Sequence, residues 1–102
     1  MAEFLPVGRI EDLPEGTMRA FQVGGEDVAV ANVDGRLHAF GDECTHQRCS
    51  LADGDLDGTS VICPCHGSEF DVRSGEVLTP PATRAVPTFG VRVADGEIQV
   101  AP

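Results

Sequence analysis

The sequence lacks three residue types and long apolar runs. Its 102 residues include no Trp, no Tyr and no Lys, and the aromatic residues are five Phe. The core must therefore consist mainly of Val, Leu, Ile and Ala, and the prominence of Val favours strands. No segment approaches the ~20 apolar residues that span a bilayer, and Met1–Ile10 lacks the pattern of a secretion signal. We expect a cytoplasmic chain with no membrane partner.

Positive charge is also scarce. Seven Arg face 17 acidic residues, which gives a formal net charge of −10. Nucleic acids and anionic membranes are poor partners for such a chain, because both bind proteins through positive charge. The charge suits docking onto a basic patch of another protein, and it equally suits solubility alone. A chain of this length predicts one domain, residues 1–102, and small domains often need a cross-link or a metal.

Short apolar runs separated by turn residues fill most of the chain. Gly-Gly or Asp-Gly pairs at 24–25, 34–35 and 95–96 favour the tight turns of hairpins. The pattern predicts an all-β sandwich or small barrel of eight to ten strands, with one short helical turn at Ile10–Glu15. The runs are Met18–Val23, Asp27–Asn32, Arg36–Phe40, Phe89–Val93 and Ile98–Val100.

Two stretches depart from the strand pattern. Asp42 to Ser68 holds all four cysteines and two of the three histidines, with an acidic turn expected at Asp53–Asp57. Thr79–Thr88 contains three prolines and is not a central strand. The third histidine, His38, lies in a strand-like run, and we expect it to be structural. In another run Val28 and Val30 alternate with Ala29 and Ala31, which predicts that one face is more heavily buried.

The residues that carry chemistry form two short groups, Cys44-Thr45-His46 and Cys63-Pro64-Cys65-His66. From each group, one thiol and one imidazole can point toward one centre. A binuclear cluster that takes two thiolates on one iron and two imidazoles on the other needs this donor set. A structural zinc site also accepts Cys₂His₂, and could exchange one thiol for Cys49 or Cys65. Spacing alone leaves both readings open.

The pattern C-x-H…C-x-x-H, followed by Gly67-Ser68, resembles the Rieske iron–sulfur family. The resemblance implies a Rieske-type antiparallel β-sandwich base with a small cluster-binding subdomain at about residues 41–82. It also implies one [2Fe–2S] cluster per chain. Cys44 and Cys63 would ligate the buried iron, and His46 and His66 the outer one.

Further residues take their expected roles from the same resemblance. Cys49 and Cys65 occupy the positions that form a disulfide in one branch of the family, which includes the proteins of quinol-oxidising complexes. Ser68 stands where high-potential members donate a hydrogen bond to a bridging sulfide, and Phe70 stands where they have a tyrosine. Pro81 belongs to a loop that covers the cluster. With one donor kept and one lost, we expect a potential below that of the quinol-oxidising type.

Among proteins of this size, the chain resembles the ferredoxin components of aromatic-ring-hydroxylating dioxygenases. This implies a soluble one-electron carrier in aromatic hydrocarbon catabolism, itself not an enzyme. Its partners would be an NAD(P)H-dependent flavin reductase and a terminal oxygenase. The alternatives are the small Rieske subunit of a larger oxidoreductase, of the arsenite oxidase or nitrite reductase type, and a non-redox zinc module.

Overall fold

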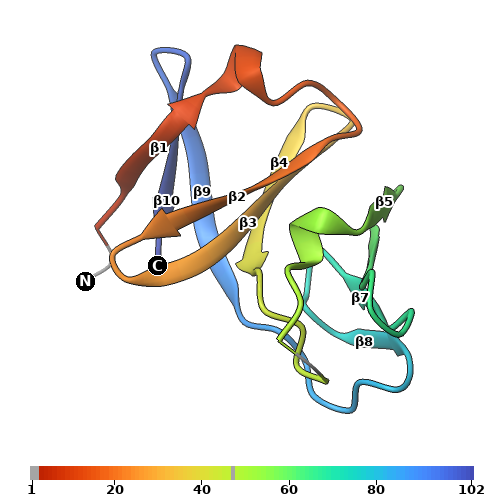
Figure 1. Ribbon diagram of the computed structural model, residues 1–102. Helices are drawn as coiled ribbons and strands as arrows, with labels where there is room; N and C mark the ends of the chain where they lie inside the picture. Colours follow the sequence, from red (N-terminus) through yellow and green to blue (C-terminus); the bar gives the residue numbers. More distant parts are fainter. Residues whose placement is uncertain (1–2, 47) are drawn as a thin grey trace.

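The computed structural model describes residues 3–46 and 48–102, which form two antiparallel sheets (Figure 1). The all-β prediction is confirmed, and the ten strands fall within the predicted range. No helix among the described residues is long and apolar enough to cross a membrane. The larger sheet has the order β1-β10-β9-β4-β3-β2 and consists of β1 (Leu5–Arg9), β2 (Met18–Val23), β3 (Glu26–Val33), β4 (Arg36–Gly41), β9 (Thr88–Ala94) and β10 (Glu97–Ala101).

The smaller sheet lies beside one end of the larger one, and the chain enters it after β4 and leaves it before β9 (Figure 1). The predicted helical turn is present as the 3₁₀ turn η1 (Ile10–Asp12), and a second 3₁₀ turn, η2 (Leu51–Asp53), precedes the small sheet. The strand order of this sheet is β5-β6-β7-β8, and it consists of β5 (Asp55–Asp57), β6 (Ser60–Ile62), β7 (Glu69–Asp71) and β8 (Val77–Thr79).

The three predicted hairpins are confirmed by the register of the larger sheet. At the β3–β4 turn, Asp34 and Gly35 have φ of 53° and 88°, and at the β9–β10 turn Asp95 and Gly96 have φ of 52° and 76°. Positive φ at both central residues matches the twist of the flanking strands, and Asp and Gly tolerate it. The turn residues therefore fix which strands become neighbours.

The larger sheet curls around a core of its own. β1 and β2, which end the strand order, also contact each other, so the sheet closes on itself into a sandwich-like barrel. This first core contains none of the cysteines or histidines. Its buried members are Leu13, Val23, Val28, Val30, Ala39, Ile98 and Val100.

A second core lies between the other face of β3–β4 and the small sheet. Ala29 and Ala31 point into it and are fully buried, as are Val28 and Val30 on the opposite face of β3. The expectation that one face of this strand is buried more heavily is therefore wrong. The short Ala side chains are covered because the small sheet packs on them. The second core consists of Ala29, Ala31, Phe40, Cys44, Leu51, Val61, Cys63, Phe70, Val72, Ala82 and Val86.

The acidic stretch expected to be a turn is only partly one. Asp53 ends η2, but Asp55–Asp57 form the edge strand β5, paired with β6. Leu56 packs against the second core while Asp55 and Asp57 are exposed. Charged side chains on an edge strand discourage pairing with other chains. The Pro-rich segment 80–87 lies between β8 and β9, outside any strand.

Candidate metal centre

The first ligand loop follows β4 and is closed by a buried carboxylate. Asp42 accepts hydrogen bonds from the Ser50 hydroxyl (2.6 Å) and the Ala52 N–H (2.9 Å). Inside the loop, the Cys44 N–H donates to the Cys49 carbonyl at 3.0 Å. These bonds hold both ends of the loop together beneath Cys44. Sequence reasoning missed Asp42, whose signal is weak: an acidic residue that directly follows a buried strand.

The second ligand loop is a tight turn between β6 and β7. The Cys63 N–H donates to the Ser68 carbonyl (2.8 Å), and the Gly67 N–H donates to the Cys63 carbonyl (3.1 Å). Gly67 has φ of 78°, a conformation that glycine adopts without steric cost. The turn holds Cys63 inside the molecule and presents His66 on the outside.

The two loops arrange the predicted donors in two layers. Cys44 and Cys63 are free thiols in the second core, 2% and 3% exposed, whereas His46 and His66 are exposed. The imidazoles face each other edge to face, with ring centroids 5.3 Å apart and planes at 73°. The thiols are therefore on the inside and the imidazoles on the surface.

The Cys63 sulfur lies in an environment with opposing effects. Burial raises the pKa of the Cys63 thiol, and the neighbouring Cys44 thiol raises it further. The N–H groups of Cys65 and His66 hydrogen-bond to the sulfur and lower its pKa, but the net direction is upward. Amide donors around a ligand sulfur are a known means of tuning iron–sulfur sites.

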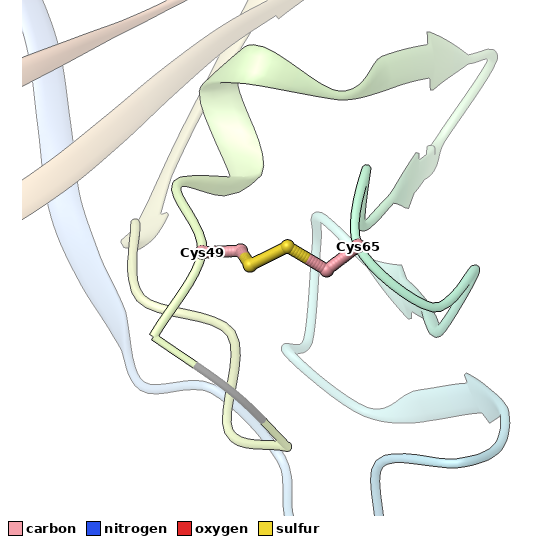
Figure 2. The surroundings of a disulfide bond; sticks show 2 residues. All are labelled: Cys49 and Cys65. Atoms are coloured by element: carbon pink, nitrogen blue, oxygen red, sulfur yellow. A yellow bond between two sulfur atoms is a disulfide. The ribbon is translucent and has the colours of Figure 1, made fainter.

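The other two cysteines join the two loops. Cys49 and Cys65 form a disulfide, with Cα atoms 6.5 Å apart, so this pairing is confirmed. Figure 2 shows the bond crossing between the two segments, beside the short helical turn that follows Cys49. Cys65 is exposed and Cys49 is half-buried. The bond fixes the separation of the loops that carry the four donors.

The spacing of ligand atoms does not fit a compact single-ion site. In a tetrahedral zinc site all ligand atoms lie roughly 3.3 to 3.8 Å apart. Among the described residues, the one group of three such atoms within 4.8 Å of one another is Cys49, Cys63 and Cys65, and two of these are in the disulfide. No described histidine belongs to it. Two thiols behind two imidazoles fit the donor requirement of a binuclear [2Fe–2S] cluster.

A third loop packs against both ligand loops. Ser68 is fully buried, and its hydroxyl accepts a hydrogen bond from the Ala82 N–H at 3.0 Å. Among the described residues, none accepts a hydrogen bond from this hydroxyl. The Thr45 hydroxyl donates to the Arg84 carbonyl. Pro81, which follows a cis peptide bond, is exposed in the same loop.

His38 lies on β4, away from the ligand loops. Burial lowers the pKa of His38, and the nearby Arg73 and Arg36 lower it further. The structural role expected for this residue stays a prediction.

Comparisons with known proteins agree with this geometry. The profile of the family described as "Rieske [2Fe-2S] domain" matches residues 3–90. Ferredoxin CarAc of Metapseudomonas resinovorans is 38% identical, over 96% of this chain and 92% of the relative. The ferredoxin component of a naphthalene 1,2-dioxygenase/salicylate 5-hydroxylase system of Ralstonia sp. is 32% identical, over 89% of this chain and 88% of the relative.

Solved structures give the same result. The ferredoxin of carbazole 1,9a-dioxygenase from Nocardioides aromaticivorans superposes with a TM-score of 0.94 at 30% identity, over 99% of both chains. A chain from a complex of reduced oxygenase and oxidised ferredoxin in carbazole 1,9a-dioxygenase superposes with a TM-score of 0.90 at 38% identity, over 96% of this chain and 92% of that one.

Proposed function

The chain belongs to the Rieske [2Fe–2S] domain family, and on that premise we propose that it carries single electrons from a flavin-dependent, NAD(P)H-oxidising reductase to a terminal ring-hydroxylating oxygenase. Its similarity to dioxygenase ferredoxins, over nearly the full length of those relatives, supports a carrier that is itself non-catalytic. The zinc alternative has no support from the spacing of the ligand atoms.

One observation carries the proposal: two buried thiols lie behind two exposed imidazoles. In this assignment Cys44 and Cys63 hold the inner iron, and His46 and His66 hold the outer one. The bound cluster supplies a centre that gains and loses one electron. Two neutral imidazoles in place of two thiolates make the cluster two charges less negative, which raises its potential above that of an all-cysteine cluster.

The surrounding residues tune and shield the centre. The second core keeps water away from Cys44 and Cys63, while the imidazole edge is left for electron exchange. We assign Ser68 as a hydrogen-bond donor to the cluster, because its hydroxyl already accepts from Ala82 and has a proton to give. The loop of Pro81 would cover one side of the cluster.

The partners are assigned by class. A relative of known structure is recorded in complex with the terminal oxygenase of a carbazole dioxygenase, which supports an oxygenase partner for this chain. The reductase is required because the carrier must be reduced again after each transfer. We place this exchange in the cytoplasm, where the pyridine nucleotide that feeds the reductase is available.

Protein-film voltammetry of the purified, coloured protein tests the proposal. We expect a reversible one-electron wave near the lower end of the Rieske range, roughly −150 to +300 mV. A wave well above zero would favour the alternative of a subunit in a larger oxidoreductase. Colourless protein without a wave would contradict the cluster assignment. For the partners, NADH-dependent reduction of an oxygenase should require the reductase, this chain and the oxygenase together.

A further inference from the structure

The disulfide has a free thiol within reach. The sulfur atoms of Cys49, Cys65 and Cys63 all lie within 4.8 Å of one another. Cys49 and Cys65 are bonded, whereas Cys63 is free. Cys44, the other free thiol, does not belong to this group. A disulfide and one thiol at this separation are the reactants of thiol–disulfide exchange.

We propose that in the cluster-free chain Cys63 exchanges into this disulfide, so that loss of the cluster converts a ligand into a blocked residue. The link to cluster loading rests on the proposed ligand role of Cys63; the exchange itself rests only on the positions of the three sulfurs. With the cluster in place, the Cys63 sulfur is bound to iron and does not react.

The reaction needs no outside oxidant. The Cys63 thiolate attacks the Cys49 sulfur, a Cys49–Cys63 bond forms, and the Cys49–Cys65 bond breaks. Cys65 leaves as a thiolate and takes up the proton that Cys63 gave up. The three cysteines hold one disulfide and one thiol both before and after the exchange, so the step is redox-neutral.

Burial decides which sulfur leaves. Cys65 is exposed, so water stabilises its thiolate as it departs. Cys49 is half-buried and packs against the second core, where a released thiolate would be less stable. Attack at Cys49 also spans two loops, whereas a Cys63–Cys65 bond would close a ring across a single residue. The expected product is therefore Cys49–Cys63 with a free, exposed Cys65.

The exchange would affect how a chain that has lost its cluster can be reloaded with iron. While the Cys49–Cys63 bond persists, the chain cannot bind iron through Cys63. Attack of the free Cys65 thiolate on Cys49 reverses the exchange without an outside reductant, so reloading has to wait for this reverse step. The buried position of Cys63 makes the exchange slow, so a cluster that is inserted promptly escapes it.

A matched pair of variants tests the exchange. Cys44→Ser and Cys63→Ser each leave three cysteines, which make one disulfide and one free thiol. Both should lack the cluster, because each loses a proposed ligand. Only Cys44→Ser keeps the thiol that lies beside the disulfide. The two proteins are incubated without oxygen and sampled over a day.

The first readout is native labelling with a maleimide. In Cys44→Ser the free thiol is initially the buried Cys63, and exchange replaces it with the exposed Cys65. We expect its labelling rate to rise tenfold or more during incubation, independently of protein concentration. In Cys63→Ser the free thiol stays the buried Cys44, and labelling should stay slow.

The second readout is disulfide mapping by mass spectrometry after acid quench and alkylation. Cleavage at the acidic residues 53, 55 and 57 separates Cys49 from Cys63 and Cys65, and fragment spectra show which of the latter two is bonded. The proposal would be overturned if the Cys44→Ser variant kept only the Cys49–Cys65 link and its maleimide labelling rate stayed unchanged.

The same experiment separates this proposal from the ligand assignment. If Cys44→Ser keeps the visible colour of a cluster, the ligand assignment fails, and the exchange is then measured by mapping in chelator-treated wild-type protein. There the Cys49–Cys63 link should appear, and its absence would overturn the exchange. Circular dichroism verifies that each variant remains folded.

Discussion

Ser68 has a contact that supports the fold and a proposed role toward the cluster. Its hydroxyl accepts a hydrogen bond from the Ala82 N–H, and we propose that it donates its proton to a cluster sulfur. A donor stabilises the more negative, reduced state, so Ser68→Ala should lower the midpoint potential. A difference of about 1 kcal/mol between the redox states corresponds to roughly 40 mV for one electron. Voltammetry measures the shift.

Ser68→Thr keeps the hydroxyl and serves as the control. It should retain most of the wild-type potential even if the added methyl group lowers stability in this fully buried position. Equal midpoints for Ser68→Ala and wild type would contradict the donor role, and would leave the Ala82 contact as the function of the side chain.

Phe70 lies in the second core together with Cys44 and Cys63. Phe70→Tyr adds a hydroxyl in this core, and the family resemblance implies that this hydroxyl would donate a hydrogen bond to a proposed ligand sulfur. We expect the midpoint to rise by about 40 mV, by the same conversion of about 1 kcal/mol. Phe21→Tyr is the control, because Phe21 packs against the first core. The midpoint potential of this variant should equal that of the wild type. A lower or unchanged midpoint in Phe70→Tyr would contradict the interpretation of this position.

At the scale of elements, the close approach of η2 to β6 depends on Gly54. A Cβ built on Gly54 would lie 1.9 Å from the carbonyl oxygen of Ile62, the residue directly before the proposed ligand Cys63. Its φ of −89° is ordinary, so the cost of Gly54→Ala is steric alone. We expect a loss of at least ~3 kcal/mol in the free energy of unfolding, measured in urea.

Gly58→Ala provides the comparison. Gly58 has φ of 59° and nothing within 4 Å of a built Cβ. Its substitution should cost only about 1 kcal/mol, from backbone strain. If Gly54→Ala proves no more damaging than Gly58→Ala, β6 can shift freely relative to η2, and the packing described for this turn is not rigid.

The larger sheet was the predictable part of the fold. β2 and β3 each carry an apolar run that ends at a Gly-containing turn, and β4 begins directly after the second of these turns, so strand and neighbour follow from local signals. The small sheet gives no such signal, because its strands have only three residues. β5 is the clearest case: two of its three residues are aspartates, which suggest a turn, and pairing with β6 makes it a strand.

The candidate site also has features that the sequence predicts and features that only the structure shows. The four proposed donors could be selected from the sequence, because thiols and imidazoles in two short groups define a recognisable pattern, and their role as ligands stays a prediction. The disulfide came only from the family resemblance, since the spacing of Cys49 and Cys65 does not itself require a bond. The role of Asp42 and the nearness of Cys63 to the disulfide depend on how the loops close in three dimensions. Local sequence signals for that closure are weak at Asp42 and lacking at Cys63.

For the whole molecule, the two cores should respond differently to cluster loss. Cys44 and Cys63 belong to the second core, whereas the first core contains no proposed ligand. Removing the cluster should increase amide exchange roughly tenfold or more across residues 42–82, equal to about 1.4 kcal/mol of local stability. β10, which packs in the first core, should change little. Hydrogen exchange followed by mass spectrometry compares cluster-loaded and chelator-treated protein.

If cluster removal accelerated amide exchange equally in both cores, this separation would be contradicted. It would show that β3, whose two faces belong to different cores, couples them into one cooperative unit.

The net charge of −10 acts over the whole surface and should govern how fast the protein meets the proposed oxygenase partner. An acidic carrier is attracted to a basic docking patch, and added salt screens that attraction. Between about 0.05 and 0.5 M NaCl we expect the second-order rate of electron transfer to fall on the order of tenfold. Stopped-flow absorbance at low protein concentration measures this rate.

The midpoint potential, recorded over the same salt range, verifies that the driving force is unchanged. A rate that rises with salt would mean that the partner's docking surface is also acidic, and that contact at the imidazole edge, not charge attraction, brings the two proteins together.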